Sequence, residues 1–396
     1  MLKNTEPDFK KSSCSYCGDA PINHTLFYLE SIISSASDAH IQKVVSQAPL
    51  FLKNFADFIL VFGFKTLLFL KFAHFSSDID KANTFRSRVI WAEAKRRGII
   101  MEQLVIFGKT LDHYRATLPG GSIYFESIPI PPRFLDMKKN WDDKVVLKEE
   151  LEKGGVPVPS YFQLPFFHLP LEQIFSELKK PVIVKPKVGS RGRHTVTNIH
   201  TLAEFRRAVQ VARQISMSLV VEEHLSGSVC RATLVQGTLA GFYRGNAPKV
   251  VGDGKQTVRE LIHEKNRKRP ERVQAINISR ELLDHIARSG FSIDEVLPLG
   301  VHLSLSHRMG RLFGGRTKEM IDDLHPSFVP IFEKAARITG LAVVGFDCIV
   351  PDPTASADSQ KWGIIECNTL PFIDLHYYAL EGKPKNIAGM IWDMWQ

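Results

Sequence analysis

The chain has 396 residues, of which 44% are hydrophobic and 23% are charged. This balance is typical of a folded globular protein and excludes collagen-like, disordered and coiled-coil chains. At about 150 residues per domain, the length predicts two or three domains. The formal net charge of +9 permits an anionic partner without selecting its class. Five scattered cysteines are too few for a disulfide framework, which predicts a cytoplasmic protein.

Residues 1–83 are rich in Phe, Ser and Lys with helical periodicity, which predicts a helical N-terminal region of unknown role. Its most apolar stretch, residues 50–75, is interrupted by lysines and an aspartate. The longest uncharged run in it, residues 58–64, is far shorter than the ~20 residues that cross a bilayer. We therefore predict core helices there rather than a membrane-surface helix, and no membrane partner.

Cys14 and Cys17 have the Cys-x-x-Cys spacing of half a zinc site, and His24 lies near enough in sequence to contribute. A second cysteine pair at suitable spacing does not follow, because the other three cysteines lie far along the chain. The sequence alone therefore favours free thiols near the terminus over a metal site.

Residues 84–140 predict a small α/β unit. A helix over 84–98 ends in a basic turn and a glycine, and strand-like runs follow at 100–107 and 122–128. The proline-rich run at 128–132 cannot continue a helix or a central strand, which places a domain boundary near residue 140.

Residues 141–396 mix helices and strands without the regular alternation of a doubly wound sheet, which favours an α+β fold. Capping boxes at Thr201–Glu204 and Thr257–Glu260 mark two helix starts. Helices are predicted over 142–154 and 326–339, and strands over 181–186, 218–223, 229–235, 238–243, 341–350 and 362–368.

The last two of these strands predict an antiparallel hairpin with its loop centred near residue 356. That register places Asp347 opposite the Ile365–Glu366 region, and Glu366 and Asn368 share a face because side chains alternate along a strand. Two carboxylates and an amide oxygen in one patch predict a Mg²⁺ site. The alternative is a polar strand face exposed to solvent.

A basic Gly/Ser loop at 187–193 follows the apolar strand that ends at Lys185. Its backbone N–H groups and cations suit phosphate oxygens, although it is neither a Walker loop nor a GxGxxG fingerprint. The alternative is a flexible basic turn. Glu222 and the residues after it end another apolar strand, whose backbone edge could hydrogen-bond a purine.

Taken together, these motifs resemble those of the ATP-grasp ligases, over roughly residues 140–396. The nucleotide lysines, phosphate loop, adenine hinge and two-magnesium motif of that family are matched in order by Asp143–Lys148, Val184–Gly192, Val221–Gly227 and Asp347 with Glu366–Asn368. Val250–Leu261 and Gly363–Pro371 are most similar to the cyanophycin synthetase and bifunctional glutathione synthetase type. Val229 stands where the family often has an acidic ribose ligand, and Gly310 where it has an asparagine.

The resemblance implies an ATP-grasp fold in which two α+β subdomains grip the nucleotide. It also implies ATP and Mg²⁺ as cofactors, with two metal ions expected and Mn²⁺ as a substitute, and a role for each matching residue. Catalytic roles fall to Arg231 and Arg308, and metal binding to Asp347, Glu366 and Asn368. Substrate binding falls to Arg244, Asp253, Gly254 and His376, and ATP binding to Lys144, Lys185, Gly189, Ser190, Gly192, Glu222, Glu223 and Leu225.

The implied activity is ADP-forming ligation of a carboxylate, from an amino acid or peptide, to an amine. The alternatives are a carboxylate–thiol ligase and a non-catalytic protein that binds nucleotide or nucleic acid. The basic cluster at 265–269 has no interleaved aromatic residues, which argues against a nucleic-acid platform. A homo-oligomer is left open.

Overall fold

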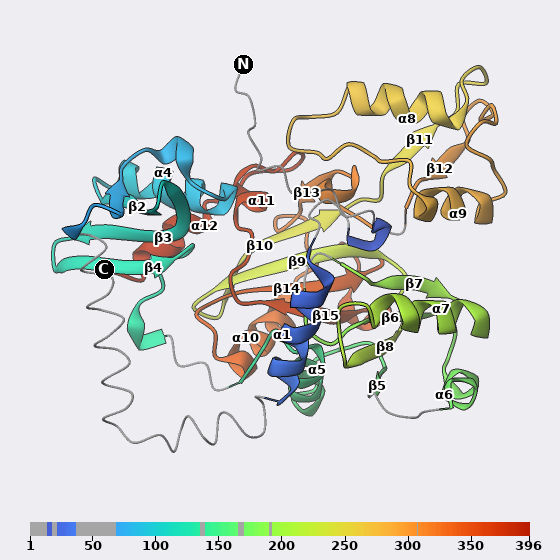
Figure 1. Cartoon of the computed structure of the whole chain (residues 1–396), viewed down its shortest axis with the longest axis horizontal. Coiled ribbons are helices and arrows are strands. Elements are labelled where there is room, and N and C mark those ends of the chain that lie inside the picture. The colour runs from blue at the N-terminus through green and yellow to red at the C-terminus, as the bar shows by residue number, and fades with distance from the viewer. Residues whose placement is uncertain are drawn as a thin grey trace. The chain divides into compact units, whose positions relative to one another are not determined.

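The computed structural model describes residues 14–17, 22–36, 69–134, 139–164, 170–189, 192–306 and 308–396. Most of the apolar stretch at 50–75 lies outside these residues. Within them, no helix has the length and hydropathy needed to cross a membrane. The chain divides into two compact units that interleave along the sequence (Figure 1). Unit 1 comprises Met1–Asp38, Pro159–His224 and Ala247–Gly315, and unit 2 comprises Ala39–Val158, Leu225–Asn246 and Arg316–Gln396.

Unit 2 contains a four-stranded antiparallel sheet in the order β1-β2-β3-β4. Helix α4 (Phe85–Arg96), capped by Thr84, packs with α12 (Ile387–Asp393) in a core that includes Ile90 and Trp392. The helical prediction for residues 1–83 is wrong at β1, which pairs with β2 over four residues. The strands are β1 (Ala73–Ser76), β2 (Ile100–Ile106), β3 (Lys109–Leu118) and β4 (Gly121–Glu126).

The second sheet of unit 2 is antiparallel, in the order β13-β10-β9-β14-β15. Alternate residues of its central strands, including Ala232 and Phe346, are fully buried against helices α5 (Lys144–Lys153) and α10 (Phe328–Thr339). The residues that lie between these along each strand therefore face the other side of the sheet, and the polar residues of the strands are among them. The strands are β9 (Ser228–Val235), β10 (Thr238–Gly245), β13 (Thr317–Glu319), β14 (Val343–Val350) and β15 (Gly363–Asn368).

Unit 1 contains a four-stranded antiparallel sheet in the order β5-β8-β6-β7. Helices α6 (Leu171–Glu177) and α7 (Leu202–Ala212) pack on it through Phe175 and Phe205. The predicted capping box at Thr201 is confirmed, with both of its hydrogen bonds present. The strands are β5 (Tyr161–Leu164), β6 (Val182–Pro186), β7 (Val196–Ile199) and β8 (Leu219–Glu223).

A smaller layer of unit 1 pairs β11 (Lys249–Val251) with β12 (His302–Ser304). Helices α8 (Val258–Arg267) and α9 (Arg280–Arg288) cover this ribbon through a separate apolar core. The capping box that opens α8 at Thr257 is confirmed. The same unit holds α1 (His24–Ala36), while the short α11 (Asp374–Tyr377) belongs to unit 2.

Candidate active site

The three central strands of the second sheet of unit 2 carry a row of charged residues. Asp347 on β14 is paired in register with Glu366 on β15 and with Arg231 on β9. The hairpin register predicted from the sequence is therefore confirmed. Directly opposed positions share a face, so the two carboxylates and the guanidinium point to the same side of the sheet.

Arg231 neutralises this row through a bidentate ion pair. Its Nε and Nη2 donate to the Asp347 oxygens at 2.6 and 2.7 Å. Burial opposes the charge of Arg231, but the nearby carboxylates, Asp347 foremost, raise its pKa above the ordinary value. Its remaining nitrogen, Nη1, is buried and has no hydrogen-bond partner among the residues that the structure describes. An unsatisfied buried donor on this face suits a ligand oxygen.

Asn368 completes the donor set two residues after Glu366. Its Nδ2 donates to Asp347 Oδ2 at 3.3 Å, so the amide lies against the carboxylate row. Two carboxylates and an amide oxygen are hard ligands, and they fit a divalent cation such as Mg²⁺. Gly345 lies opposite Asn368, and a Cβ there would sit 2.8 Å from Pro371 Cβ, so the close backbone approach requires glycine.

Helix α5 is tied to the strand that carries Glu366. Asp143 caps the helix, and Lys144 is its first residue, with only 4% of its surface exposed. One turn later, the fully buried Lys148 donates from Nζ to the Ile365 carbonyl at 3.1 Å. These contacts fix the helix start beside the carboxylate strand, although they do not test the role predicted for Lys144.

His376 lies deep in unit 2, with no exposed surface. Its Nδ1 lies 2.5 Å from Glu319 Oε2, and its Nε2 lies 2.8 Å from Thr233 Oγ1. A Cβ on Gly241 would lie 2.5 Å from Nδ1, so any larger residue at position 241 would overlap the imidazole. Both ring nitrogens are engaged inside the protein, which indicates a structural position, and its substrate role stays a prediction.

Arg244 is placed apart from the carboxylate row. It pairs in register with Cys230, whose side chain belongs to the apolar core on the opposite face of the sheet. Its Nε donates to Ser228 Oγ at 2.8 Å. The structure therefore does not bring Arg244 together with Arg231, and the substrate-binding role of Arg244 stays a prediction.

In unit 1, the predicted nucleotide residues Lys185 and Glu222 form a buried ion pair. Lys185 Nζ lies 2.7 Å from Glu222 Oε1, and the side chains are 8% and 1% exposed. The two residues lie on the adjacent strands β6 and β8. Glu222 is therefore the counter-charge of Lys185 in this structure, and the nucleotide role of both residues stays a prediction.

Other predicted nucleotide residues flank this pair. Gly189 and Gly192 adopt positive φ values of 132° and 62°, which glycine adopts without steric strain. Ser190 lies outside the described residues. Glu223 continues β8, where its N–H donates to the Ser160 carbonyl at 2.9 Å, and the buried Leu225 begins the next segment of unit 2.

The predicted substrate residues Asp253 and Gly254 form a turn before α8. Asp253 Oδ1 accepts hydrogen bonds from the N–H groups of Gln256 and Lys255, both at 2.8 Å. These bonds lower the pKa of the carboxyl. The observed contacts shape the turn, and binding of substrate there stays a prediction.

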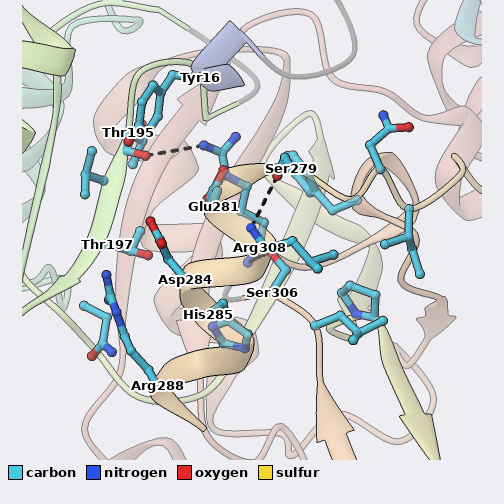
Figure 2. A pocket seen from close by; sticks show the side chains of 18 of the residues that line it. Tyr16, Thr195, Thr197, Ser279, Glu281, Asp284, His285, Arg288, Ser306 and Arg308 are labelled. Atoms are coloured by element: carbon cyan, nitrogen blue, oxygen red, sulfur yellow. Dashed lines mark hydrogen bonds and ion pairs between the residues drawn. The ribbon is translucent and has the colours of Figure 1, made fainter. Parts of the chain in front are cut away.

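Arg308 lines a cavity of about 340 Å³ within unit 1 (Figure 2). Its Nε donates to Glu281 Oε1 at 3.0 Å, and its side chain stacks over Phe313. Thr197 of β7 and His285 of α9 face the cavity from either side. Burial lowers the pKa of His285. Arg207 and Arg288 also line the cavity, as do the carboxylates of Glu204, Glu281 and Asp284, so the wall is of mixed charge.

Sequence reasoning missed the cavity residues of α9, because that helix was not predicted and its polar face has no spacing motif. It also missed His194, which lies beside Cys14, Cys17 and His24. Since 177 residues separate His194 from Cys17, no local pattern could have joined them.

The chain is similar in sequence to two groups of known proteins. The chain is 29% identical over 259 residues to a cyanophycin synthetase of Nostoc sp., a match that covers 64% of this chain and 29% of that protein. It is 29% identical over 262 residues to the bifunctional glutathione biosynthesis protein of Streptococcus mutans, covering 63% of this chain and 34% of the relative. The chain thus spans about a third of the length of these relatives.

Among solved structures, the bifunctional glutathione synthetase of Pasteurella multocida superposes with a TM-score of 0.53 and 21% identity. This match covers 78% of the present chain and 43% of that one. It supports a shared α+β fold. No protein-family model matches the chain.

Proposed function

Because the chain is related to the ATP-grasp ligases cyanophycin synthetase and bifunctional glutathione synthetase, we propose that it is an ATP-dependent, ADP-forming carboxylate–amine ligase. A carboxylate oxygen of the first substrate attacks the γ-phosphorus, and ADP leaves. The amine of the second substrate attacks the resulting acylphosphate at carbon, phosphate departs, and the amine loses a proton. The row of Asp347, Glu366 and Arg231 on one sheet face carries this proposal.

We assign metal binding to Asp347, Glu366 and Asn368. When bound there, Mg²⁺ would offset the charge of the β- and γ-phosphates during transfer. In the structure Arg231 neutralises Asp347, and its buried Nη1 keeps one hydrogen-bond position without a partner among the described residues. We assign that position to an oxygen of the substrate carboxylate or of the acylphosphate, because guanidinium groups bind such oxygens well.

We assign phosphate binding to Lys185 and Lys144, with Gly189 and Gly192 allowing backbone N–H groups to approach. Lys185 would pair with Glu222 when ATP is absent and with a phosphate of ATP when it is bound, so its charge would be compensated in both states. A charge-assisted bond of this kind contributes about 1.5–3 kcal/mol.

For the substrates we propose amino acids or peptides. The cavity around Arg308 supports this choice, because its wall holds three arginines and three carboxylates that suit the carboxylate and ammonium groups of such molecules. Arg308 would then select substrate rather than touch the reacting atoms.

A phosphate-release screen over pairs of amino acids and dipeptides tests the function, with mass spectrometry of condensed products. We expect release to require ATP, Mg²⁺ and both substrates, and Glu366→Gln to lower kcat about 100-fold. Asp358→Asn, an exposed residue of the same hairpin loop, is the matched control and should keep full activity. Full turnover in Glu366→Gln would contradict the metal assignment, and a thioester product would favour a thiol ligase.

A further inference from the structure

Four side chains of metal-binding types meet in unit 1, next to the loop at 187–193. Cys14, Cys17, His24 and His194 each offer one ligand atom, and these atoms all lie within 4.8 Å of one another. They come from three segments of the chain: the turn at residues 14–17, the first residue of α1, and the loop before β7. Two thiols and two imidazoles are a donor set that favours zinc.

The separations between these atoms are close to those of a tetrahedral zinc site. His194 Nε2 lies 3.6 Å from Cys14 Sγ and 3.5 Å from Cys17 Sγ. With Zn–S near 2.3 Å and Zn–N near 2.05 Å, a tetrahedron requires a sulfur–nitrogen edge of about 3.6 Å. The distance from Cys17 Sγ to His24 Nε2 is 3.0 Å, and this edge would lengthen on binding.

The surroundings of His194 suit a metal ligand. The side chain is fully buried, and its Nδ1 lies 2.7 Å from the Val211 carbonyl. A carbonyl oxygen can only accept a hydrogen bond, so Nδ1 carries the proton and Nε2 directs its lone pair toward the two sulfurs. Zinc-binding histidines are oriented in this way by a carbonyl or carboxylate partner. The backbone of His194 also adopts φ 49°, an uncommon conformation for a residue other than glycine.

We propose that Cys14, Cys17, His24 and His194 bind one Zn²⁺ in a closed, four-coordinate structural site. The sequence favoured free thiols because it lacked a second pair of ligands nearby, and the fold supplies the missing donor from a distant loop. Binding requires both thiols to lose their protons, and the metal charge then compensates the two thiolates.

The site would fasten the N-terminal segment to the base of the loop at 187–193. The His194 N–H already donates to the Tyr16 carbonyl at 3.0 Å. Cys14 and Tyr16 also line the cavity around Arg308. Zinc would therefore hold one wall of that cavity in place.

The first test uses the full chain purified under reducing conditions. We expect elemental analysis to find one zinc per chain after gel filtration. Substitution with Co²⁺ should give the strong visible bands of tetrahedral coordination and a thiolate-to-cobalt charge-transfer band. X-ray absorption should show sulfur near 2.3 Å and nitrogen near 2.05 Å in equal numbers.

Variants then identify the ligands. Cys17→Ser and His194→Gln should each reduce zinc content at least tenfold. Cys230→Ala and His113→Gln, which alter residues outside the cluster, should retain it. If a ligand variant does not fold, the cobalt spectrum of the unmodified chain decides the question.

Four results would overturn the proposal. The first is a chain that holds no zinc after incubation with the ion. The second is a cobalt spectrum without the thiolate band. The third is retention of full zinc content by Cys17→Ser. A Cys14–Cys17 disulfide found by mass spectrometry in the reduced preparation would also exclude the site.

Discussion

Replacing Asp347 by asparagine should destabilise the folded chain, because it removes the counter-charge of a buried guanidinium. Arg231 is 9% and Asp347 16% exposed, so the pair is largely shielded from water. At an effective dielectric constant near 20, unit charges about 4 Å apart attract by about 4 kcal/mol. Asparagine keeps one acceptor for Arg231, and some solvent reaches the site. We therefore expect a loss of about 2–3 kcal/mol.

The assay is thermal unfolding of the chain without nucleotide or metal, followed by circular dichroism. A loss of this size lowers Tm by roughly 5–10 °C for a unit of 150–250 residues. Asp358→Asn serves as the control and should leave Tm unchanged. In a double-mutant cycle, adding Arg231→Met to Asp347→Asn should cost at least about 1 kcal/mol less than the sum of the single changes. An unchanged Tm for Asp347→Asn, or strict additivity, would refute the reasoning.

Three further predictions concern binding and stability. Lys185→Met should weaken ATP binding about 10–100-fold, since it removes a charge-assisted contact and leaves Glu222 buried without its lysine; calorimetric titration measures this. Gly241→Ala should cost about 1–3 kcal/mol of unfolding free energy by denaturant titration, because the new methyl overlaps His376. Hydrogen bonds from Arg96 and, to a smaller extent, from Arg97 lower the pKa of Glu93 from 4.5 to about 2. Burial of the carboxyl group opposes this shift. The Glu93 carboxylate should therefore contribute about 3 kcal/mol to the free energy of unfolding above pH 4.5, and this contribution should be lost as the pH falls to 2.

Each of these predictions has a control. Lys179→Met, on the exposed surface of unit 1, should leave ATP affinity unchanged. Gly120→Ala adds its methyl to open space and should be neutral. For the pH dependence, Glu93→Gln should be less stable than the unmodified chain at neutral pH and equal to it near pH 2. If the two chains differ in stability by the same amount from neutral pH to pH 2, the ionised carboxylate is not the source of the stabilisation.

The sequence allowed the hairpin register to be predicted, because turn position and strand alternation are local properties. Asp347 and Glu366 lie opposite each other as expected. The capping boxes at Thr201 and Thr257 were readable for the same reason, since each lies within four consecutive residues.

Contacts between distant segments could not be predicted in this way. The pairing of Arg231 with Asp347 depends on β9 lying beside β14, which no spacing encodes. The burial of His376 against Glu319 depends on two further segments meeting under Gly241. Similarly, β1 was missed because a four-residue strand is defined by its partner rather than by its own pattern.

The packing of α12 on α4 constrains the order of events during synthesis. Trp392 Nε1 donates to the Ile90 carbonyl at 3.0 Å across a sequence separation of 302 residues, and both side chains are fully buried. The first sheet to leave the ribosome therefore has an exposed apolar surface until α12 emerges. Because closing so long a loop is slow, this sheet should be a binding site for chaperones on the nascent chain. A fragment that ends near residue 140 should aggregate, and supplying the α12 segment in trans should rescue it.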